Sequence, residues 1–320
     1  MSTAYRGRFA PSPTGDLHLG SAAAALVAWC AVREAGGTFV VRIEDLDRPR
    51  QVAGAEARQL ADLRWLGLDW DEGPDKGGPA GPYRQSERAP AYAAALEALR
   101  ARGLVYPCDC SRSEIAALVS APHRGEDGPR YPGTCRAGEA TRTFRRRPAW
   151  RFRVEPGIAV VEDRFLGRFE QDVAAQVGDF VVMRADAVPA YQLAVVVDDL
   201  AMGISEVVRG ADLLDSMPRQ ILLARALGGT VPRHGHLPLV LAPDGARLAK
   251  RDGGSTIAEL REAGWSPPQL VGRLAATLGL VTTEEGRAGR VPSELLGAGR
   301  LDRLAGRREV RWHPAEDRAH

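Results

Sequence analysis

The chain has 320 residues, 44% of them apolar, and a formal net charge of +2 at pH 7. This length accommodates one large domain or two small ones with a sizeable core, and the balanced charge alone gives no argument for binding nucleic acid. The longest apolar run, residues 22–32, is too short to span a bilayer, and the N-terminus lacks the basic and apolar regions of a signal peptide. We therefore expect a cytoplasmic enzyme that binds neither membrane nor DNA.

The first part of the chain predicts a βαβ unit followed by two amphipathic helices. Residues 6–9 are expected to form a short strand, and a loop rich in proline and glycine leads from it into a helix over 21–34. The segment 38–43 is β-branched and almost continuously apolar, which is typical of a buried parallel strand. Further helices are predicted over 54–67 and 88–103. The loop before the first helix would then lie at the carboxyl end of a strand, where open α/β sheets bind ligands.

The remainder of the chain mixes irregular segments with predicted strands and helices. Residues 106–153 accumulate Cys, Pro, Gly and Arg while helical periodicity fades, which favours an inserted subdomain. In the strand expected over 150–154, alternation turns Phe152 inward and Arg151 toward solvent. A hairpin is predicted over 179–198 with its turn at 186–189, and helices are predicted over 216–228 and 256–263.

The loop that opens the first helix carries a lone histidine between two glycines. Unpaired N–H groups at a helix N-terminus attract phosphate, and Gly15 and Gly20 would let a phosphate approach the backbone closely. His18 lies between them and can donate a hydrogen bond to a phosphate oxygen as charge builds in a transition state. The alternative interpretation is a tight turn with an incidental histidine.

A second candidate loop lies late in the chain, where RLAKR (residues 247–251) is flanked by glycines. Lys76 and Lys250 are the only lysines among the 43 basic residues, so a lysine retained in this loop suggests that an ammonium group is required there. Flexible flanks would let Lys250 close over a bound polyphosphate and stabilise pyrophosphate as it leaves. The alternative interpretation is a solvated basic turn.

Three of the four cysteines lie within one short window, which suggests a metal site rather than disulfides. Cys108, Cys110 and Cys135 supply three thiols, and zinc favours four tetrahedral ligands. From the chemistry alone, His123 is the candidate for the fourth ligand. The alternative is a set of reduced cysteines buried in a small subdomain. Cys30, within the first predicted helix, is expected to belong to the core.

Six arginines alternate with aromatic residues over 141–154. Such a pattern can follow a nucleic-acid backbone and stack on bases. The other interpretation is an amphipathic strand, so contact with RNA is left open at this stage.

Taken together, these motifs resemble one known family. RFAPSPTGDLHLG, IEDLDRPR and the late RLAKR resemble the catalytic core of class I glutamyl-tRNA synthetases, over about residues 6–257. HLGS stands where the family has HIGH, with Ser21 in place of the second histidine. RLAKR stands where the family has KMSKS, with Ala249 in place of the serine before the lysine. The resemblance implies a Rossmann-like class I aminoacyl-tRNA synthetase α/β core with an inserted zinc-binding subdomain and a short helical C-terminal region.

The resemblance also implies a division of the chain into four parts. Residues 1–105 would form the first half of the catalytic domain, and 106–178 an inserted acceptor-type subdomain with the zinc site. Residues 179–245 would complete the catalytic domain, and 246–320 would hold the lysine loop and a short helical region without an anticodon-binding domain.

The reaction implied is attack by the α-carboxylate of glutamate on the α-phosphorus of ATP, which travels with Mg²⁺ and releases pyrophosphate. His18 and Lys250 would be catalytic and, with Gly20, would contact ATP. The glutamate-binding positions implied are Arg8, Phe9, Ala10, Pro11, Ser12, Glu44, Tyr191 and Arg209. Arginines suit the side-chain carboxylate and Glu44 suits the α-ammonium group. For zinc, the resemblance favours Tyr131 over His123, which gives the ligand set Cys108, Cys110, Tyr131 and Cys135.

The chain ends soon after the lysine loop, as in truncated members of this family that resemble a catalytic core alone. Those members activate glutamate without tRNA and transfer it to the queuosine base in the anticodon loop of tRNA(Asp), which is the function expected here. One alternative is a truncated synthetase that charges the acceptor end of a tRNA. Another is an inactive RNA-binding relic, in view of Ala249. A different nucleotidyltransferase would leave the set Arg8, Glu44 and Arg209 unexplained.

Overall fold

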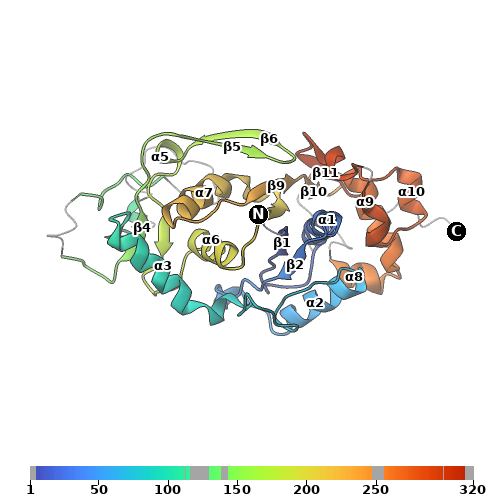
Figure 1. The fold of residues 1–320 in the computed structure, drawn as a ribbon, viewed down its shortest axis with the longest axis horizontal. Coiled ribbons are helices and arrows are strands. Elements are labelled where there is room, and N and C mark those ends of the chain that lie inside the picture. Colours follow the sequence, from blue (N-terminus) through green and yellow to red (C-terminus); the bar gives the residue numbers. More distant parts are fainter. Residues whose placement is uncertain are drawn as a thin grey trace.

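The computed structural model describes residues 5–111, 113–115, 130–137, 143–246, 256–297 and 299–313. Its centre is a six-stranded sheet with the order β2-β1-β8-β9-β5-β6 (Figure 1). The first five strands in this order pair in parallel, and β6 runs antiparallel to β5 at the edge. In chain order these strands are β1 (Arg6–Phe9), β2 (Thr38–Val41), β5 (Ile158–Asp163), β6 (Gly167–Asp172), β8 (Glu206–Gly210) and β9 (Arg233–Leu237).

The predicted βαβ unit is confirmed. β1 and β2 pair in parallel, with Arg6 opposite Thr38 and Phe9 opposite Val41, and α1 (Leu19–Glu34) connects them. Residues 22–32 of α1 are all buried, as expected of a helix that is apolar around its circumference. Its side chains share one core with those of β1, β2 and the C-terminal helices. The loop that carries His18 therefore lies at the carboxyl end of β1.

A second core forms beside the central sheet. It joins α3 (Ala89–Ala101), α6 (Tyr191–Ala201) and α7 (Met217–Ala226) to a three-stranded antiparallel sheet of the order β3-β4-β7. The strands of that sheet are β3 (Val105–Cys108), β4 (Ala149–Phe152) and β7 (Val181–Met183). The helices predicted over 88–103 and 216–228 are confirmed as α3 and α7, and the helix over 54–67 as α2 (Ala55–Trp65).

Of the hairpin predicted over 179–198, a turn near residues 186–189 is present, since Met183 and Pro189 form an antiparallel bridge across it, but the second strand is wrong. β7 pairs with β4, and the chain then enters the helix α6 instead of returning as a second strand. Residues 192–199 of α6 are all buried, so their apolar run carries no polar face to mark a helical period. A short run of this kind does not distinguish a buried helix from a strand.

The sheets cross the subdomain boundaries expected from sequence. β5 and β6 lie within residues 106–178, yet β5 pairs with β9 in the central sheet. β7 lies after residue 178, yet it pairs with β4. The division into four parts remains a prediction, with these two connections between its parts.

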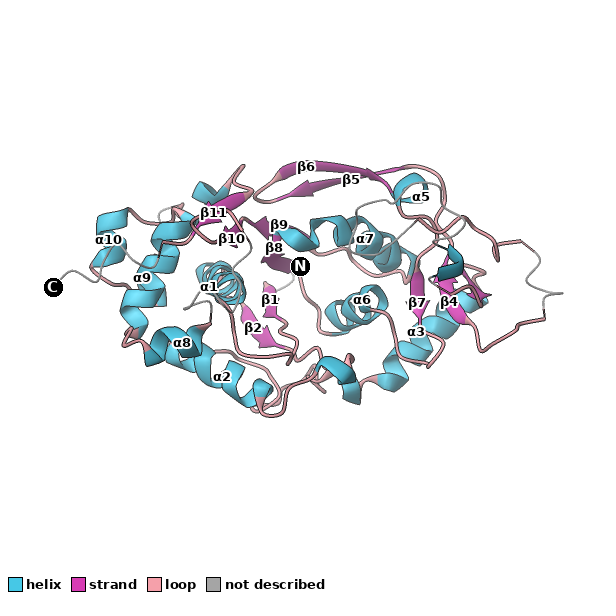
Figure 2. Cartoon of the chain, turned by 180° about the vertical axis from the view of Figure 1, so that it is seen from behind, coloured by secondary structure: helices cyan, strands magenta, loops and turns pink. Residues whose placement is uncertain are grey.

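The C-terminal region packs against α1 and is mostly helical (Figure 2). It contains α8 (Ile257–Glu262), α9 (Pro267–Leu278) and α10 (Thr283–Arg287). A short parallel pair joins β10 (Leu239–Leu241) to β11 (Glu309–Arg311). The remaining elements are α5 (Val173–Gln176) and the short 3-10 helices η1 (Arg48–Arg50), η2 (Gln85–Glu87), η4 (Ala211–Ser216), η6 (Pro292–Leu295) and η7 (Leu301–Leu304). Within the described ranges, no helix combines the length and apolarity needed to cross a membrane.

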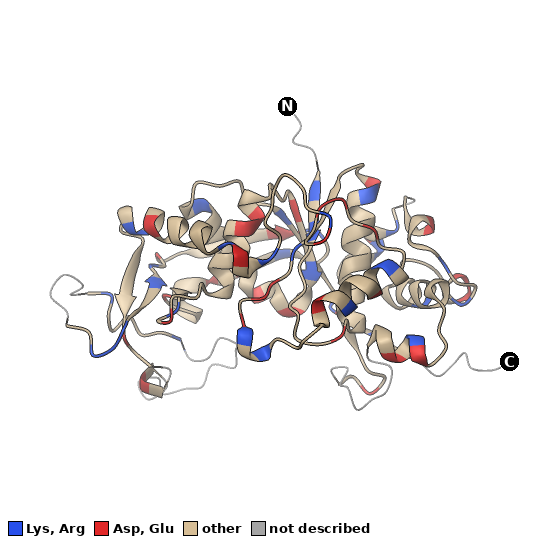
Figure 3. Cartoon of the chain, turned by 90° about the horizontal axis from the view of Figure 1, so that it is seen from below, with Lys and Arg blue, Asp and Glu red and all other residues tan. Residues whose placement is uncertain are grey.

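Charged residues of both signs occupy the same helices and loops (Figure 3). Some of these charges are buried inside the molecule, among them Arg8, Arg42, Asp198, Asp199 and Arg209. Because a buried charge is costly unless it is paired, this internal cluster is a candidate binding site.

Candidate active site

The histidine loop is held by the start of α1. His18 is the N-cap residue of this helix, and its Nδ1 accepts a hydrogen bond from the backbone N–H of Ser21 at 3.2 Å. The Ser21 hydroxyl lies 2.9 Å from Nε2 of the same ring. A Cβ atom on Gly20 would approach His18 Nδ1 to 3.3 Å, so the ring packs closely on a glycine. Ser21, at the variable position of the motif, thus helps to hold the histidine ring.

The helix α2 supports this loop from outside the motif. Gln59 is buried, and its side-chain amide donates to the carbonyl oxygens of Ser12 at 3.0 Å and Gly15 at 2.8 Å. Arg58, one residue earlier, forms an ion pair with Asp16. Nothing in the sequence marked Gln59, because its partners are backbone carbonyls distant in the chain.

The start of α8 reaches the same loop. Thr256 forms a β-bridge with His18, and the N–H of Ile257 donates to the carbonyl of Leu17 at 2.8 Å. The RLAKR loop with Lys250 and Ala249 lies outside the described residues, so the place of Lys250 remains a prediction. The described part of the chain begins again at Thr256, six residues after Lys250, and Thr256 contacts the histidine loop.

Four of the predicted glutamate-binding residues lie in one cluster, in which the charges of Arg8, Glu44 and Arg209 act on Tyr191. Arg8 comes from β1, Arg209 from β8, Tyr191 from the first turn of α6, and Glu44 from the segment after β2. Partial burial raises the pKa of the Tyr191 phenol, and the charges of Arg209, Glu44 and Arg8 also act on it. Tyr191 is 38% exposed, so this cluster of side chains is accessible from solvent.

The other four predicted positions, residues 9–12, form the end of β1 and the start of the segment that leads to His18. Phe9 and Pro11 are buried, Ala10 is half-buried and Ser12 is exposed. The carbonyl of Pro11 accepts a hydrogen bond from the backbone N–H of Glu44 at 2.9 Å. This bond fixes the segment after β1 against the segment after β2.

Arg209 is a buried cation that lacks a carboxylate partner. Its guanidinium donates from Nε to His236 Nε2 at 2.9 Å, from Nη1 to Gln220 Oε1 at 2.8 Å, and from Nη2 to the carbonyl of Leu213 at 3.2 Å. All three acceptors are neutral, and within the described part of the chain no carboxylate lies at ion-pair distance. Burial lowers the pKa of Arg209, with Arg8 adding to this effect. Such a site is suited to an anionic ligand.

A buried ion network, missed by the sequence analysis, supports the cluster. Arg42 is fully buried and pairs with Asp199 at 2.6 Å, Glu44 at 3.2 Å and Asp198 at 3.6 Å. Asp199 also lies 3.4 Å from Arg8. Burial raises the pKa of Glu44, although Arg42 and Arg8 oppose this. Two consecutive aspartates at the end of an apolar run were the available signal, but the segment had been interpreted as a hairpin.

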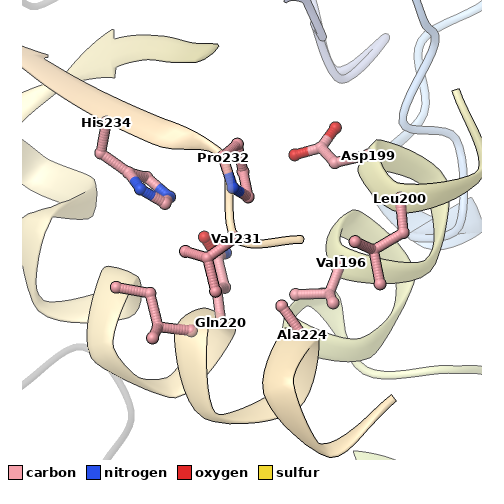
Figure 4. A pocket seen from close by; sticks show the side chains of 9 residues that line it. Val196, Asp199, Leu200, Gln220, Ala224, Val231, Pro232 and His234 are labelled. Atoms are coloured by element: carbon pink, nitrogen blue, oxygen red, sulfur yellow. The ribbon is translucent and has the colours of Figure 1, made fainter. Parts of the chain in front are cut away.

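A small cavity adjoins the cluster (Figure 4). Asp199 and Gln220 border it, and it is otherwise lined mainly by apolar residues of α6 and α7 with His234 of β9. Its volume of about 10 Å³ is the room of about one water molecule. The cavity is therefore too small to be a substrate site, and the cluster of Arg8, Glu44, Tyr191 and Arg209 beside it is the candidate.

The predicted cysteine cluster assembles as a metal-type site. The sulfur atoms of Cys108, Cys110 and Cys135 all lie within 4.8 Å of one another. The Tyr131 hydroxyl lies 3.4 Å from Cys108 Sγ and accepts from the backbone N–H of Cys135 at 2.8 Å. Three thiols and one phenol oxygen match the number of ligands that structural zinc requires. His123 lies outside the described residues, so the choice of fourth ligand remains a prediction.

The expectation that Arg151 faces solvent is wrong. Its side chain is buried, stacks on the Tyr131 ring at 3.8 Å and donates to the carbonyl of Asp179 at 2.8 Å. These partners hold the guanidinium inside the protein, although its Nε finds no acceptor there, and a simple alternation of apolar and polar residues does not foresee this burial. Burial opposes ionisation of Cys108, but Tyr131 and Arg151 lower its pKa below the usual value. This favours a thiolate, the form that binds zinc, at Cys108, whereas burial and the neighbouring thiols raise the pKa of Cys110 to about 12.

The basic run before β4 is partly paired. Arg145 and Arg146 both form ion pairs with Glu114 and remain about half exposed. Contact of this segment with RNA remains a prediction.

Comparison with known proteins gives consistent matches. Residues 4–287 match the family model described as tRNA synthetases class I (E and Q), catalytic domain. A glutamyl-Q tRNA(Asp) synthetase of Symbiobacterium thermophilum is 55% identical over 287 residues, covering 87% of this chain and 88% of that protein. A protein of the same name from Nitratidesulfovibrio vulgaris is 49% identical over 281 residues, covering 86% and 87%. Glutamate–tRNA ligase 2 of Acidithiobacillus ferrooxidans is 45% identical over 276 residues, covering 84% of this chain and 57% of that ligase.

A solved structure agrees with these matches. The crystal structure of a glutamate tRNA ligase from Elizabethkingia meningosepticum, in complex with its amino acid, superposes with a TM-score of 0.83 at 28% identity. The superposition covers 97% of this chain and 67% of that one. The Rossmann-like class I fold expected from the sequence is thereby confirmed. The chain belongs to the class I (E and Q) tRNA synthetase family, whose catalytic domain it contains, and is an enzyme of the ligase type.

Proposed function

We propose that this enzyme activates glutamate with ATP, without tRNA, and transfers the glutamyl group to the queuosine base in the anticodon loop of tRNA(Asp). The observation that carries the glutamate assignment is Arg209, a buried guanidinium whose described acceptors are all neutral. A substrate carboxylate would supply the missing counter-charge. The names of the relatives at 55% and 49% identity support the choice of queuosine-bearing tRNA(Asp).

Different residues of the site bind the different charged groups of the substrate. Arg209 and Arg8 bind the side-chain carboxylate of glutamate, with Tyr191 beside it. Glu44 accepts the α-ammonium group, and the backbone of residues 9–12 positions the reacting α-carboxylate beside the histidine loop. This arrangement uses each charge of the substrate once, so neutral amino acids bind weakly.

ATP, with its Mg²⁺, binds where the histidine loop meets the start of α8. His18 donates to a phosphate oxygen, Gly20 lets the phosphates approach the helix N-terminus, and Lys250 neutralises the departing pyrophosphate. The α-carboxylate attacks the α-phosphorus, so no protein nucleophile is needed and catalysis consists of positioning and charge stabilisation. Cys108, Cys110, Tyr131 and Cys135 would hold a structural zinc ion, which links β3 to the loop before β4.

The experiment has two stages. ATP–pyrophosphate exchange is measured first, with glutamate as the single amino acid and no tRNA. Labelled glutamate is then offered with tRNA(Asp) bearing queuosine, with the same tRNA lacking queuosine, and with unmodified tRNA(Glu). The proposal requires exchange in the first stage and labelling of the queuosine-bearing tRNA alone in the second.

A second candidate is supported by the match to glutamate–tRNA ligases, the first of which is 45% identical. In that case the enzyme charges the acceptor end of a tRNA, and tRNA(Glu) becomes labelled in the second stage. Absence of both exchange and tRNA labelling would favour the remaining alternative, an inactive RNA-binding protein.

A further inference from the structure

Behind Arg209 lies a chain of hydrogen bonds that reaches across the central sheet. Arg209 Nε donates to His236 Nε2 at 2.9 Å, and His236 Nδ1 lies 2.6 Å from Asp163 Oδ2. Arg209 comes from β8, His236 from the neighbouring β9, and Asp163 from the end of β5 beyond it. The side chains of His236 and Asp163 have no exposed surface.

Only one arrangement of protons is chemically possible in this series of hydrogen bonds. The guanidinium of arginine always carries its Nε proton, so His236 Nε2 must present a lone pair. The single imidazole proton then lies on Nδ1 and is donated to Asp163. A doubly protonated His236 would direct an N–H against the N–H of Arg209, and burial together with the Arg209 charge keeps its pKa low.

Asp163 is itself fixed by the backbone. Its Oδ1 accepts the N–H groups of Phe165, Leu166 and His236, each at 3.0 Å. These bonds and the proton of His236 oppose the effect of burial and lower the pKa of the carboxyl. The Asp163 carboxylate, ionised and held in place, therefore lies at the end of the hydrogen-bond series opposite Arg209. It determines which ring nitrogen of His236 carries the proton.

This arrangement leaves a defined part of Arg209 free. A guanidinium has five N–H donors, and three of them are bonded to His236, Gln220 and Leu213. The two that remain lie one on each terminal nitrogen, which is the number that a bidentate carboxylate contact uses.

We propose that Asp163 and His236 are positioning residues that fix the Arg209 guanidinium and thereby determine the affinity of the enzyme for the side-chain carboxylate of its amino acid. This inference rests on the proposed function, because it assumes that Arg209 binds that carboxylate. Neither residue touches the substrate, and each acts through the next member of the chain.

The first test uses Asp163→Asn, which keeps the size of the side chain. An amide can donate to Nδ1 of His236, which moves the imidazole proton to Nε2 and sets it against Arg209. We expect the KM for glutamate in ATP–pyrophosphate exchange to rise about 10- to 100-fold, with the KM for ATP changing less than about threefold. His234→Gln is the matched control: this buried histidine of β9 stacks on His236 at 6.2 Å and lines the small cavity instead (Figure 4).

A second test asks whether Asp163 acts through His236. In a His236→Leu background, Asp163→Asn should add little further increase in the KM for glutamate, because residues that act in series are not additive. Multiplying effects would show that the two residues act separately and would overturn the proposal.

A third measurement does not depend on enzymatic activity. Nitrogen-15 NMR of the six histidine side chains in the wild-type protein, with His236→Gln for assignment, should show His236 as the neutral tautomer protonated at Nδ1. An Nε2-protonated or charged ring at pH 7 would overturn the proposal. A wild-type enzyme without glutamate-dependent exchange would instead refute the proposed function, while the tautomer still decides whether the chain of hydrogen bonds exists.

Discussion

Replacing Arg209 with glutamine should abolish most of the affinity for glutamate while sparing the fold. The variant keeps a polar, though shorter, side chain and removes the buried positive charge. Three donors of Arg209 are used within the protein, so two of its five remain for the substrate. At about 1.5–3 kcal/mol for each hydrogen bond to a charged group, their loss amounts to about 3–6 kcal/mol. Since about 1.4 kcal/mol corresponds to a factor of ten, we expect affinity to fall by about 10²- to 10⁴-fold.

Two assays measure this loss. The KM for glutamate in ATP–pyrophosphate exchange should rise by that factor, and calorimetry should show the same loss of direct binding. Arg233→Gln serves as control, because Arg233 is 70% exposed and pairs with Glu206 at the opposite end of the strands. Its KM for glutamate should stay within about twofold of wild type. An unchanged KM in Arg209→Gln would refute the idea that this cation awaits the substrate.

Three further outcomes are expected. Metal analysis should find one zinc ion per wild-type chain and almost none in Cys108→Ser. Cys30→Ala, which alters a buried core cysteine, is the control and should retain the zinc. Zinc-free wild-type protein would contradict the assignment. Gly20→Ala places a methyl group 3.3 Å from His18 Nδ1, so kcat for exchange should fall about 10- to 100-fold with the KM for glutamate unchanged, and an unaltered kcat would argue against His18. Burial raises the pKa of Asp62 to about 6 from its ordinary 3.8. Between these two pH values the folded protein therefore binds more protons than the unfolded chain, and the free energy of unfolding falls as the pH rises. Asp62→Asn cannot lose a proton, so its Tm should match wild type near pH 4 and exceed it at pH 7, and a lower Tm at pH 7 would contradict the assigned burial effect.

Local sequence was sufficient to predict the elements that carry the signature loops. The first strand and the helix after it were predicted because a loop rich in proline and glycine separates them, and because the apolar run of the helix ends at Gly36 and Gly37. The four residues Arg8, Glu44, Tyr191 and Arg209 were expected from motif positions, and the fold brings them together. Tyr191 lies near Arg8, Glu44 and Arg209 as expected, even though α6 itself was predicted as part of a hairpin, and its role in binding glutamate stays a prediction.

What could not be predicted depends on contacts between distant segments. Asp163 and His236 are separated by 73 positions and meet because β5 pairs with β9. Arg151 is buried because the Tyr131 ring and a carbonyl are available to it, which its own strand does not reveal. Periodicity reports which face of an element is apolar, but it contains no information about which polar partner will occupy that face.

The helix α2 contacts both ends of the proposed nucleotide site. Gln59 holds the loop before His18, and three residues later Asp62 lies 3.3 Å from Arg261 on α8, the helix that follows the lysine loop in sequence. One turn of a single helix thus supports two segments, the loop before His18 and α8, that are about 240 residues apart in the sequence. Substitutions that shift α2 should therefore disturb both partners at once, and directed evolution of either loop should select compensating changes in this turn.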